Sequence, residues 1–285
     1  MTTQQIGRLS VKQLIFSNMA FKWNINPVGT NIYVDKDGND TTGVIGDPQL
    51  PYKSIAKATS VGTSGNNIIL GNGVWSEQRT LNSIGFKWWG NGRTIINCTI
   101  ITALTLYNTD NLYFIEYIGS YNAITRITAG QRVFLAQFCR LKNLKGNQYE
   151  GFHTLKNSIL VNCSANGGAY VNLDMQNCIL INSNIDGKTA SENGGSVKII
   201  NNIIIGLQAI NTSEINSSCD YNNFTTLSIP TTNGANSHSI NNASTGQTVA
   251  NYFNNYNATS PELSDFTAKL GSKNIRAGYG NGGVS

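Results

Sequence analysis

The sequence predicts a parallel β-helix, in which the chain winds repeatedly around one core. A short pattern recurs four times between residues 155 and 224, with steps of 20, 25 and 20 residues between its central asparagines, and such a period is typical of a solenoid. Each copy alternates apolar with polar residues, which indicates a strand and not a helix. Asn, Gly, Ser and Thr also punctuate the chain every few residues, as the corners of coils require. The central asparagines are Asn157, Asn177, Asn202 and Asn222.

These four asparagines are expected to lie one above another, with Leu155, Met175 and Ile200 beside them and pointing into the core. Stacked amides can then hydrogen-bond along the axis of the rod. We interpret the repeat as scaffold, so that function lies on the loops, the outer faces or the N-terminal arm. No apolar stripe on the exterior is evident from the pattern.

Composition narrows the classes of protein that the chain can belong to. The chain has 285 residues, of which 40% are hydrophobic and only 12% charged, and we read it as a single solenoid domain. The net charge of +5 is spread without basic runs, so nucleic-acid binding is not predicted. Five cysteines at irregular intervals favour neither a disulfide framework nor a zinc site. Neither a signal peptide nor a membrane span is predicted.

Residues 1–30 lie outside the repeat and form a predicted N-terminal arm. The arm is rich in apolar residues, which is unusual for a loose tail, yet it is too short for a domain. Two interpretations remain open. The arm caps the open end of the helix, or it docks on another subunit.

The stretch that follows carries a family resemblance. Its strand-like, turn-like and helix-like segments are Asn31 to Asp35, Asp37 to Asp40, Pro51 to Ala58, Asn67 to Leu70 and Gly73 to Glu77. Residues 31–77 thus resemble the first-coil module of right-handed parallel β-helix proteins of the pectate-lyase-like superfamily, which includes phage tail and virion proteins. Residues 260–278 resemble the closing segment of the same superfamily. The resemblance implies an all-β, single-stranded right-handed parallel β-helix over residues 31–285, but no particular activity.

A short helix near Pro51 is predicted to cap the first coil, because an open solenoid end exposes apolar side chains and unpaired strand edges. Pro51 suits the first turn of a helix. Two buried faces fit the helical spacing equally well. They are Ile55, Ala58 and Thr59, or Ala56, Thr59 and Ser60.

Catalytic chemistry is not predicted. Enzymes of this fold need acids or bases on neighbouring coils, whereas the carboxylates here fall at different phases of the repeat. They are Glu116, Glu150, Asp174, Asp186, Glu192, Glu214 and Asp220. Asp35, Asp37 and Asp40 could hold Ca²⁺, but a tight turn is favoured. His153 and His238 are read as surface or turn residues, and no metal or cofactor is expected.

Aromatic residues are the candidate binding groups. Adjacent residues of a strand point to opposite faces, so one of Trp88 and Trp89 should point inward and the other outward. An outer ring, with neighbouring tyrosines, could stack on a sugar, although core packing and interface burial are alternatives. The candidate glycan-binding residues are Trp88, Trp89, Tyr113 and Tyr117.

The resulting hypothesis is a non-enzymatic structural or receptor- or glycan-binding β-helix, a phage virion component such as a tail, tail-fibre or decoration protein. Its partners would be other virion subunits, bound through residues 1–30, and a host-surface glycan; a homo-oligomer is possible. The protein would assemble in the host cytoplasm, and a bacterial surface or leaderless secretion is the alternative location. The alternative function is a polysaccharide lyase or glycoside hydrolase, with a groove near Trp88, Glu116, Glu150 and His153.

Overall fold

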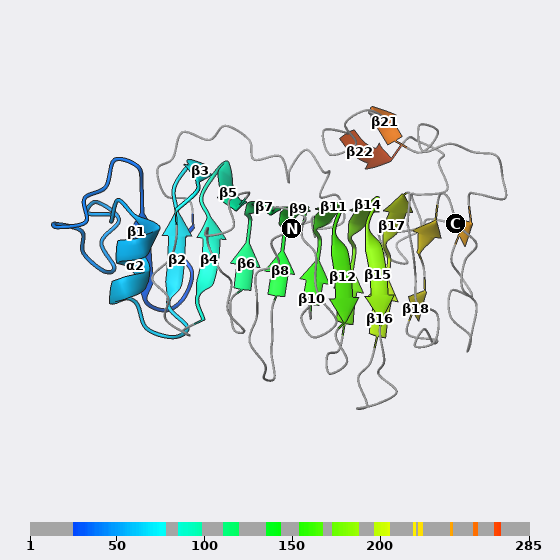
Figure 1. Ribbon diagram of the computed structural model, residues 1–285, viewed down its shortest axis with the longest axis horizontal. Coiled ribbons are helices and arrows are strands. Elements are labelled where there is room, and N and C mark those ends of the chain that lie inside the picture. The colour runs from blue at the N-terminus through cyan, green and yellow to red at the C-terminus, as the bar shows by residue number, and fades with distance from the viewer. Residues whose placement is uncertain are drawn as a thin grey trace, which may run out of the picture.

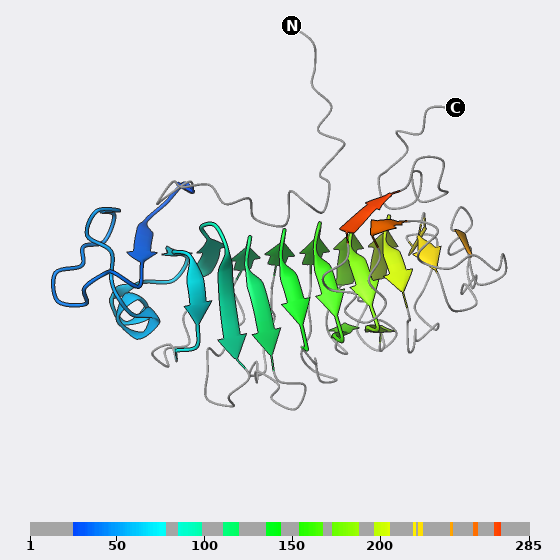
Figure 2. The ribbon, with the colours of Figure 1, turned by 90° about the horizontal axis from the view of Figure 1, so that it is seen from above.

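The computed structural model shows a rod built from stacked coils (Figure 1). It describes residues 25–77, 85–98, 111–119, 135–143, 154–167, 173–187, 197–205, 219–220, 222–224, 240–241, 253–255 and 265–268. Among these residues there is one helix, and all other regular elements are strands. The coils follow one another along the long axis of the rod, and their strands form separate sheets on its sides (Figure 2).

Two nine-stranded sheets, both entirely parallel, form the rod. Sheet A contains, in spatial order, β1 (Asn31–Val34), β2 (Asn67–Leu70), β4 (Lys87–Gly90), β6 (Asn111–Tyr113), β8 (Leu135–Gln137), β10 (Thr154–Lys156), β13 (Leu173–Gln176), β16 (Val197–Ile200) and β18 (Cys219–Asp220). Sheet B contains β3 (Gly73–Trp75), β5 (Thr94–Cys98), β7 (Glu116–Gly119), β9 (Arg140–Lys142), β11 (Ile159–Val161), β14 (Ile179–Ile181), β17 (Ile203–Ile205), β19 (Asn223–Phe224) and β20 (Ile240–Asn241). Because each strand pairs with the equivalent strand of the next coil, the predicted parallel β-helix is confirmed.

Two smaller strand pairs complete the described structure. In two successive coils the chain forms an additional strand after its sheet B strand. These strands, β12 (Ser164–Gly167) and β15 (Asn184–Gly187), pair in parallel with each other. The antiparallel pair β21 (Phe253–Asn255) and β22 (Asp265–Ala268) is not part of a coil. Residues Asp265–Ala268 are the only described part of the predicted closing segment 260–278, and they form a hairpin strand beside β14 and β17 (Figures 1 and 2).

The core consists of one inward column from each sheet. In sheet A the column passes through Trp88, Leu112 and Ala136 and continues to Leu155 and Met175. In sheet B it contains Trp75, Ile96, Tyr117, Leu141, Leu160, Leu180 and Ile204. All of these side chains are buried in one cluster, so each coil adds apolar contacts only to its neighbours, as in other solenoids.

Helix α2 (Ile55–Val61) covers the start of the rod, which confirms the predicted cap. Ile55, Ala58 and Thr59 are its buried face, so the first of the two proposed faces is correct. The predicted place of Pro51 is wrong. Ser54 is the N-cap and accepts a hydrogen bond from the Lys57 N–H, whereas Pro51 precedes the helix, because Tyr52 is held in a parallel bridge to β1.

Residues 25–30 are attached to the first two coils. The Asn31 amide donates to the Asn26 side chain at 2.8 Å, and the Asn67 amide donates to the Val28 carbonyl at 3.2 Å. This part of the predicted arm is therefore hydrogen-bonded to the first two coils. Residues 1–24 lie outside the described residues.

The predicted single column of asparagines is wrong by one residue. Register places Gln176 beside Ile200, so the column of Asn157 and Asn177 continues with Asn201 and not with Asn202. Likewise Leu155 and Met175 are followed in the core by Ile199, not Ile200. A shift of one residue exchanges the two faces of a strand.

The asparagines instead form two adjacent columns. In the outer column the Asn177 amide donates to Asn157 at 3.2 Å. In the inner column Asn202 and Asn222 are buried, and the Asn202 amide donates to Asn222 at 3.1 Å. The Asn202 oxygen also accepts from the Cys178 N–H at 2.8 Å, so the inner column satisfies backbone groups that are shielded from water.

The expected lack of an exterior apolar stripe is also wrong. In β11 and β14 all three residues are apolar and buried, although alternate residues must face outward. The outward residues are Ile159, Val161, Ile179 and Ile181, which are 3%, 3%, 7% and 0% exposed. Other parts of the chain must therefore cover this exterior stripe, and β21 and β22 lie beside it (Figures 1 and 2).

Candidate ligand-binding face

The outer face of sheet A carries side chains in columns that run along the rod. Register aligns Trp89 with Tyr113 on the next strand, and Tyr113 with Gln137 on the strand after that. One residue further along each coil the chain turns from sheet A toward sheet B. This corner forms a second column, which contains Gly90, Phe114, Phe138, Asn157, Asn177 and Asn201.

Four partly exposed rings in these two columns form what we call the aromatic row: Trp89, Tyr113, Phe114 and Phe138. The Trp89 and Tyr113 rings stack with centroids 4.0 Å apart and planes 12° from parallel. Phe114 and Phe138 stack at 5.0 Å and 8°, and Trp89 lies 6.4 Å from Phe114. Each stacked pair contributes about 0.5–1.5 kcal/mol beyond its burial, so the row is a stiff feature of the surface.

The backbone beneath the row is strained. Phe114 and Phe138 both have φ of 55°, a left-handed conformation that costs a bulky L-residue about 1–2 kcal/mol. Asn157, Asn177 and Asn201 adopt the same conformation at this corner in the next three coils, with φ of 50°, 55° and 58°. Asparagine tolerates that conformation far better. The sequence therefore keeps two phenyl rings at corners where asparagine is the less strained residue.

A polar network adjoins the aromatic row on the next two strands. It consists of Lys156, Asp174 and Gln176. The Lys156 ammonium lies 3.7 Å from one carboxylate oxygen of Asp174, and the Gln176 amide donates to the other oxygen at 2.6 Å. Lys156 follows Gln137 in the register of sheet A, so the network continues the column that begins at Trp89.

The two ring stacks end where the polar network begins. Next in register after Tyr113 is Gln137, and next after Phe138 is Asn157. One face of each ring is therefore turned toward an amide side chain and not toward another ring. Adjacent strands are only about 4.8 Å apart, so a ligand cannot insert between each ring and this amide. It would contact the exposed parts of the rings and the polar network together.

Tyr113 contributes a neutral hydroxyl to this face. Burial raises the pKa of Tyr113, and the neighbouring Cys139 raises it further. The phenol consequently keeps its proton at neutral pH and can both donate and accept a hydrogen bond.

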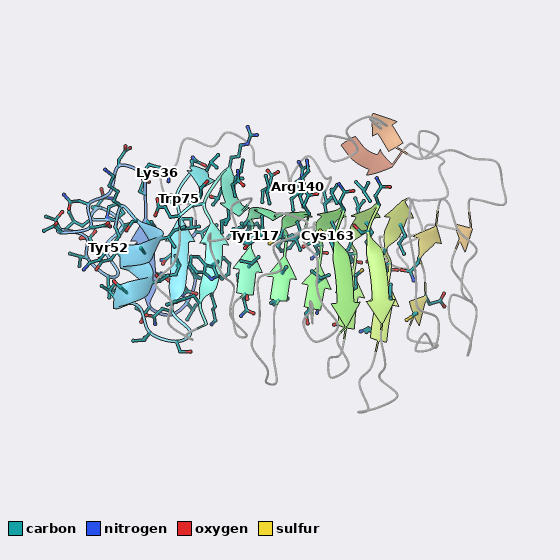
Figure 3. All side chains as sticks on the ribbon, viewed as in Figure 1. Lys36, Tyr52, Trp75, Tyr117, Arg140 and Cys163 are labelled. Carbon is teal, nitrogen blue, oxygen red and sulfur yellow. The ribbon has the colours of Figure 1, made fainter. Side chains whose placement is uncertain are left out.

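The predicted glycan-binding residues separate into two pairs. Trp88 and Tyr117 are 0% and 1% exposed and belong to the core, so the prediction that they contact a surface ligand is wrong. Figure 3 shows Tyr117 between the two sheets. Trp89 and Tyr113 lie on the outer face, as their alternation with Trp88 and Leu112 requires.

Sequence reasoning missed Phe114 and Phe138. Both follow a short strand directly and are 24 residues apart, close to one coil. That spacing is the signal that could have found them. Their side chains, however, belong to a corner and not to a strand, so strand alternation gave no indication of their direction.

The groove proposed for an enzyme is not assembled by the described residues. Trp88 points into the core from sheet A, whereas Glu116 lies on the outer face of sheet B beside Arg140, which points away from the rod in Figure 3. Glu150 and His153 lie outside the described residues. Asp174 lies on the candidate face, and Asp220 follows Gln176 and Ile200 in an outward column at the end of sheet A.

The acidic residues near the first strand make turns. Asp35 accepts a hydrogen bond from the Asp37 N–H at 3.0 Å, and Asp40 accepts from Ser54 and Lys53 beside helix α2. This supports the tight-turn interpretation. Within the described ranges no group of three or more His, Cys, Asp or Glu side chains could hold a metal ion. In the same ranges no helix is long and apolar enough to cross a membrane.

Comparisons with known proteins return similar folds at low similarity. Rhamnogalacturonan lyase matches at 15% identity and a TM-score of 0.29, over 63% of this chain and 56% of that one. A pectin methylesterase from Aspergillus niger matches at 16% and 0.33, over 79% and 89%. The pectate lyase Pel9A matches at 15% and 0.31, over 90% and 93%.

This chain thus spans little more than half the length of the rhamnogalacturonan lyase. No protein-family model and no curated protein sequence matches it. Identities and TM-scores of this size carry no argument about activity. The assignment of the parallel β-helix rests on the strand pairing within the chain itself.

Proposed function

We propose that this protein is a non-enzymatic β-helix that binds a glycan or a receptor through the outer face of sheet A. The observation that carries the proposal is the pair of phenylalanines at left-handed corners. A strained backbone at a surface position suggests that the side chain is needed for function. Here the strained residues, Phe114 and Phe138, extend a partly exposed aromatic row.

The architecture suits a binding role. Sites on rigid elements hold their groups more precisely than sites on loops. Trp89 and Tyr113 lie on strands that pair on both sides, and Phe114 and Phe138 directly follow such strands. Aromatic side chains lose little conformational entropy on binding and offer a large contact area. Polar groups at the rim would then select the ligand.

A virion is the setting that we propose for this rod, with residues 1–24 docking on another subunit and the candidate face turned toward the host surface. The proposal for the setting comes from the family resemblance and from the apolar composition of the arm. We also propose that two or three copies of the protein associate through this arm.

Substitution of Phe138 by Asn tests the binding role. It removes one ring but retains a residue that the next coil uses at the same corner, so the fold should persist. We expect wild-type protein to bind one or more members of an array of neutral and acidic glycans, and the variant to lose at least about tenfold in affinity. Asn182→Gly is the control, because Asn182 has φ of 46° at a different corner, the one that directly follows β14.

Two results would reject the proposal. Binding that is equal in wild type and Phe138→Asn would show that the aromatic row is not the site. Release of new reducing ends or unsaturated products from any glycan would show that the alternative function, a polysaccharide lyase or glycoside hydrolase, is correct. Circular dichroism of each variant checks that the fold is intact.

A further inference from the structure

We infer that residues 1–24 dock over the aromatic row of their own chain, so that the N-terminal arm and a ligand compete for one face. The inference rests on the proposed function and adds a means of regulation to it. It is drawn from the place where residues 25–30 meet the rod and from the burial of the first two coils of sheet A.

The outer face of sheet A is covered where the rod begins. Its two outward columns start with Asn31 and Asn67 and with Tyr33 and Ile69. These residues alternate with core residues and so point outward, yet all four are buried, and Ile69 is 0% exposed. On the next two strands of the same columns Trp89 and Tyr113 are partly exposed. Another part of the chain therefore lies over the first two coils.

Residues 25–30 supply part of this cover. The Asn67 backbone N–H donates to the Thr30 carbonyl at 2.9 Å, and the Asn67 side-chain amide donates to the Val28 carbonyl at 3.2 Å. The side-chain oxygen of Asn67 accepts from the indole N–H of Trp89 at 3.0 Å. One asparagine thus joins the end of the arm to the first ring of the aromatic row, and the preceding 24 residues start beside that row.

The sequence of the arm suits an apolar face. Met19, Phe21 and Trp23 occupy alternate positions, which predicts an extended segment with three large apolar side chains on one side. Phe138, the last ring of the row, follows the third strand after β2 in sheet A, at a distance of about 14 Å. An extended chain covers that distance in about five residues, so residues 19–24 alone can span the row.

Charge opposes this contact. The described outward columns of sheet A carry the charged residues Lys87, Lys156, Lys198, Asp174 and Asp220, one more positive than negative. Residues 1–24 carry three basic side chains and no acidic one. The attraction must therefore come from burial of apolar and aromatic surface. Because salt screens the repulsion, the contact should strengthen as salt is added, whereas an ionic contact would weaken.

A single apolar segment with two alternative docking sites makes ligand binding depend on assembly. In the free protein the arm covers the aromatic row. When the arm docks on another subunit, the row is open to a ligand. A ligand binds with an apparent affinity that is reduced by the fraction of molecules whose face is covered, so the arm keeps the candidate face closed until the protein assembles.

Hydroxyl-radical oxidation of the full-length protein, followed residue by residue with mass spectrometry, tests the contact without any ligand. The triple variant Met19→Ser, Phe21→Ser, Trp23→Ser removes the apolar side of the arm. We expect Tyr113 and Phe138 to be oxidised at least about fivefold faster in the triple variant than in wild type, as for a face that is covered in about four-fifths of the molecules. Added salt should slow their oxidation in wild type.

Val28→Ser is the matched control. It removes an apolar side chain from the same N-terminal region, but Val28 is 98% exposed, so both oxidation rates should stay as in wild type. Equal rates in wild type and the triple variant would overturn the inference and leave the proposed binding function intact. Protection that disappears on dilution would also overturn it, because the covering arm would then belong to a second copy.

Binding to the glycan array separates this inference from the proposed function. We expect the triple variant to bind its glycan at least about fivefold more tightly than wild type does. Equal affinities would overturn the competition between arm and ligand. If oxidation rises in the triple variant but neither protein binds a glycan, the proposed function is overturned and the contact of the arm stands alone.

Discussion

Asparagine has two different roles at the same corner of this β-helix, and adjacent residues fill them. Asn177 is exposed and holds a left-handed backbone conformation. Asn202, in the neighbouring column, is buried and hydrogen-bonds through both atoms of its amide. The first role depends on backbone conformation, and the second depends on satisfying groups that water cannot reach.

These roles predict unequal costs on substitution. Asn202→Ala removes the acceptor of the buried Cys178 N–H and the amide that donates to the Met175 carbonyl and to Asn222, so we expect it to lower the free energy of unfolding by about 3 kcal/mol. Asn177→Gly retains the left-handed corner and should cost less than about 1 kcal/mol. Urea denaturation measures both. Equal costs would show that the amide network of Asn202 contributes little.

Two buried thiols predict a pH dependence of stability. Burial raises the pKa of Cys139 and of Cys178 to about 12 in the folded protein, whereas an unfolded cysteine ionises near pH 8.5. Between these values the unfolded chain loses protons that the folded protein keeps. The stability conferred by the neutral thiols is therefore complete below about pH 8 and falls as the pH rises toward 12.

Urea denaturation from pH 7 to 10.5 measures this loss, with a Cys139→Ser, Cys178→Ser double variant as the control for the titration of other groups. Serine already stands in the same inner column, at Ser158. The difference in slope between wild type and double variant is the contribution of the thiols. Parallel curves for the two proteins would contradict the prediction.

At the scale of elements, the exterior stripe on sheet B is the feature that needs a cover. Apolar side chains on an exposed outer face of adjacent strands are a site of self-association. The hairpin of β21 and β22 lies beside β14 and β17 in both views (Figures 1 and 2), so we assign it the role of shielding the stripe.

Removal of residues 243–285 should accordingly expose the stripe. We expect the shortened protein to self-associate at micromolar concentration, as measured by light scattering, while its β-sheet circular dichroism persists. Replacing Ile159 and Ile179 by Thr in the shortened protein should restore the original particle size, because threonine retains the β-branched shape and is more polar. A shortened protein that stays at its original size without these replacements would show that the hairpin is not the cover.

For the whole molecule, assembly depends on the predicted N-terminal arm. Hydrogen bonds from Asn31 and Asn67 attach residues 25–30 to the first coils, so the boundary for a deletion lies at residue 24. We expect a chain that starts at Ile25 to retain its circular dichroism and melting temperature but to lose self-association or binding to partner subunits.

Light scattering of the full-length and shortened proteins checks this expectation. A monomer in both cases would argue against assembly through the arm. A fall in melting temperature of the shortened protein would instead favour the other interpretation, in which residues 1–24 cap an open end of the solenoid.

The parallel β-helix could be predicted from the sequence because the repeat is local and periodic. Apolar and turn residues recur at fixed distances, so every coil carries the same information. The cap could be predicted for the same reason, since Ile55 and Ala58 have helical spacing within one short segment. Likewise, alternation placed Trp88 and Trp89 on opposite faces. The predicted single strand over Leu155 to Ile159 is wrong, because the left-handed corner at Asn157 divides it into β10 and β11.

Register and corner geometry could not be predicted in this way. Two consecutive asparagines, Asn201 and Asn202, fit the repeat equally well, and only the pairing between coils decides which one lies beside Asn177. Similarly, Phe114 and Phe138 join the aromatic row because adjacent corners stack, a contact between residues 24 apart in the chain.

The sequence by itself determined that this chain forms a solenoid and that adjacent strand residues point to opposite faces, because both follow from short-range periodicity. Only the tertiary structure decided which side chains of different coils become neighbours. That choice depends on the packing of whole coils against each other, where a shift of one residue moves a side chain from the core to the surface. The candidate face, which combines rings and polar groups from five coils, exists only at that level.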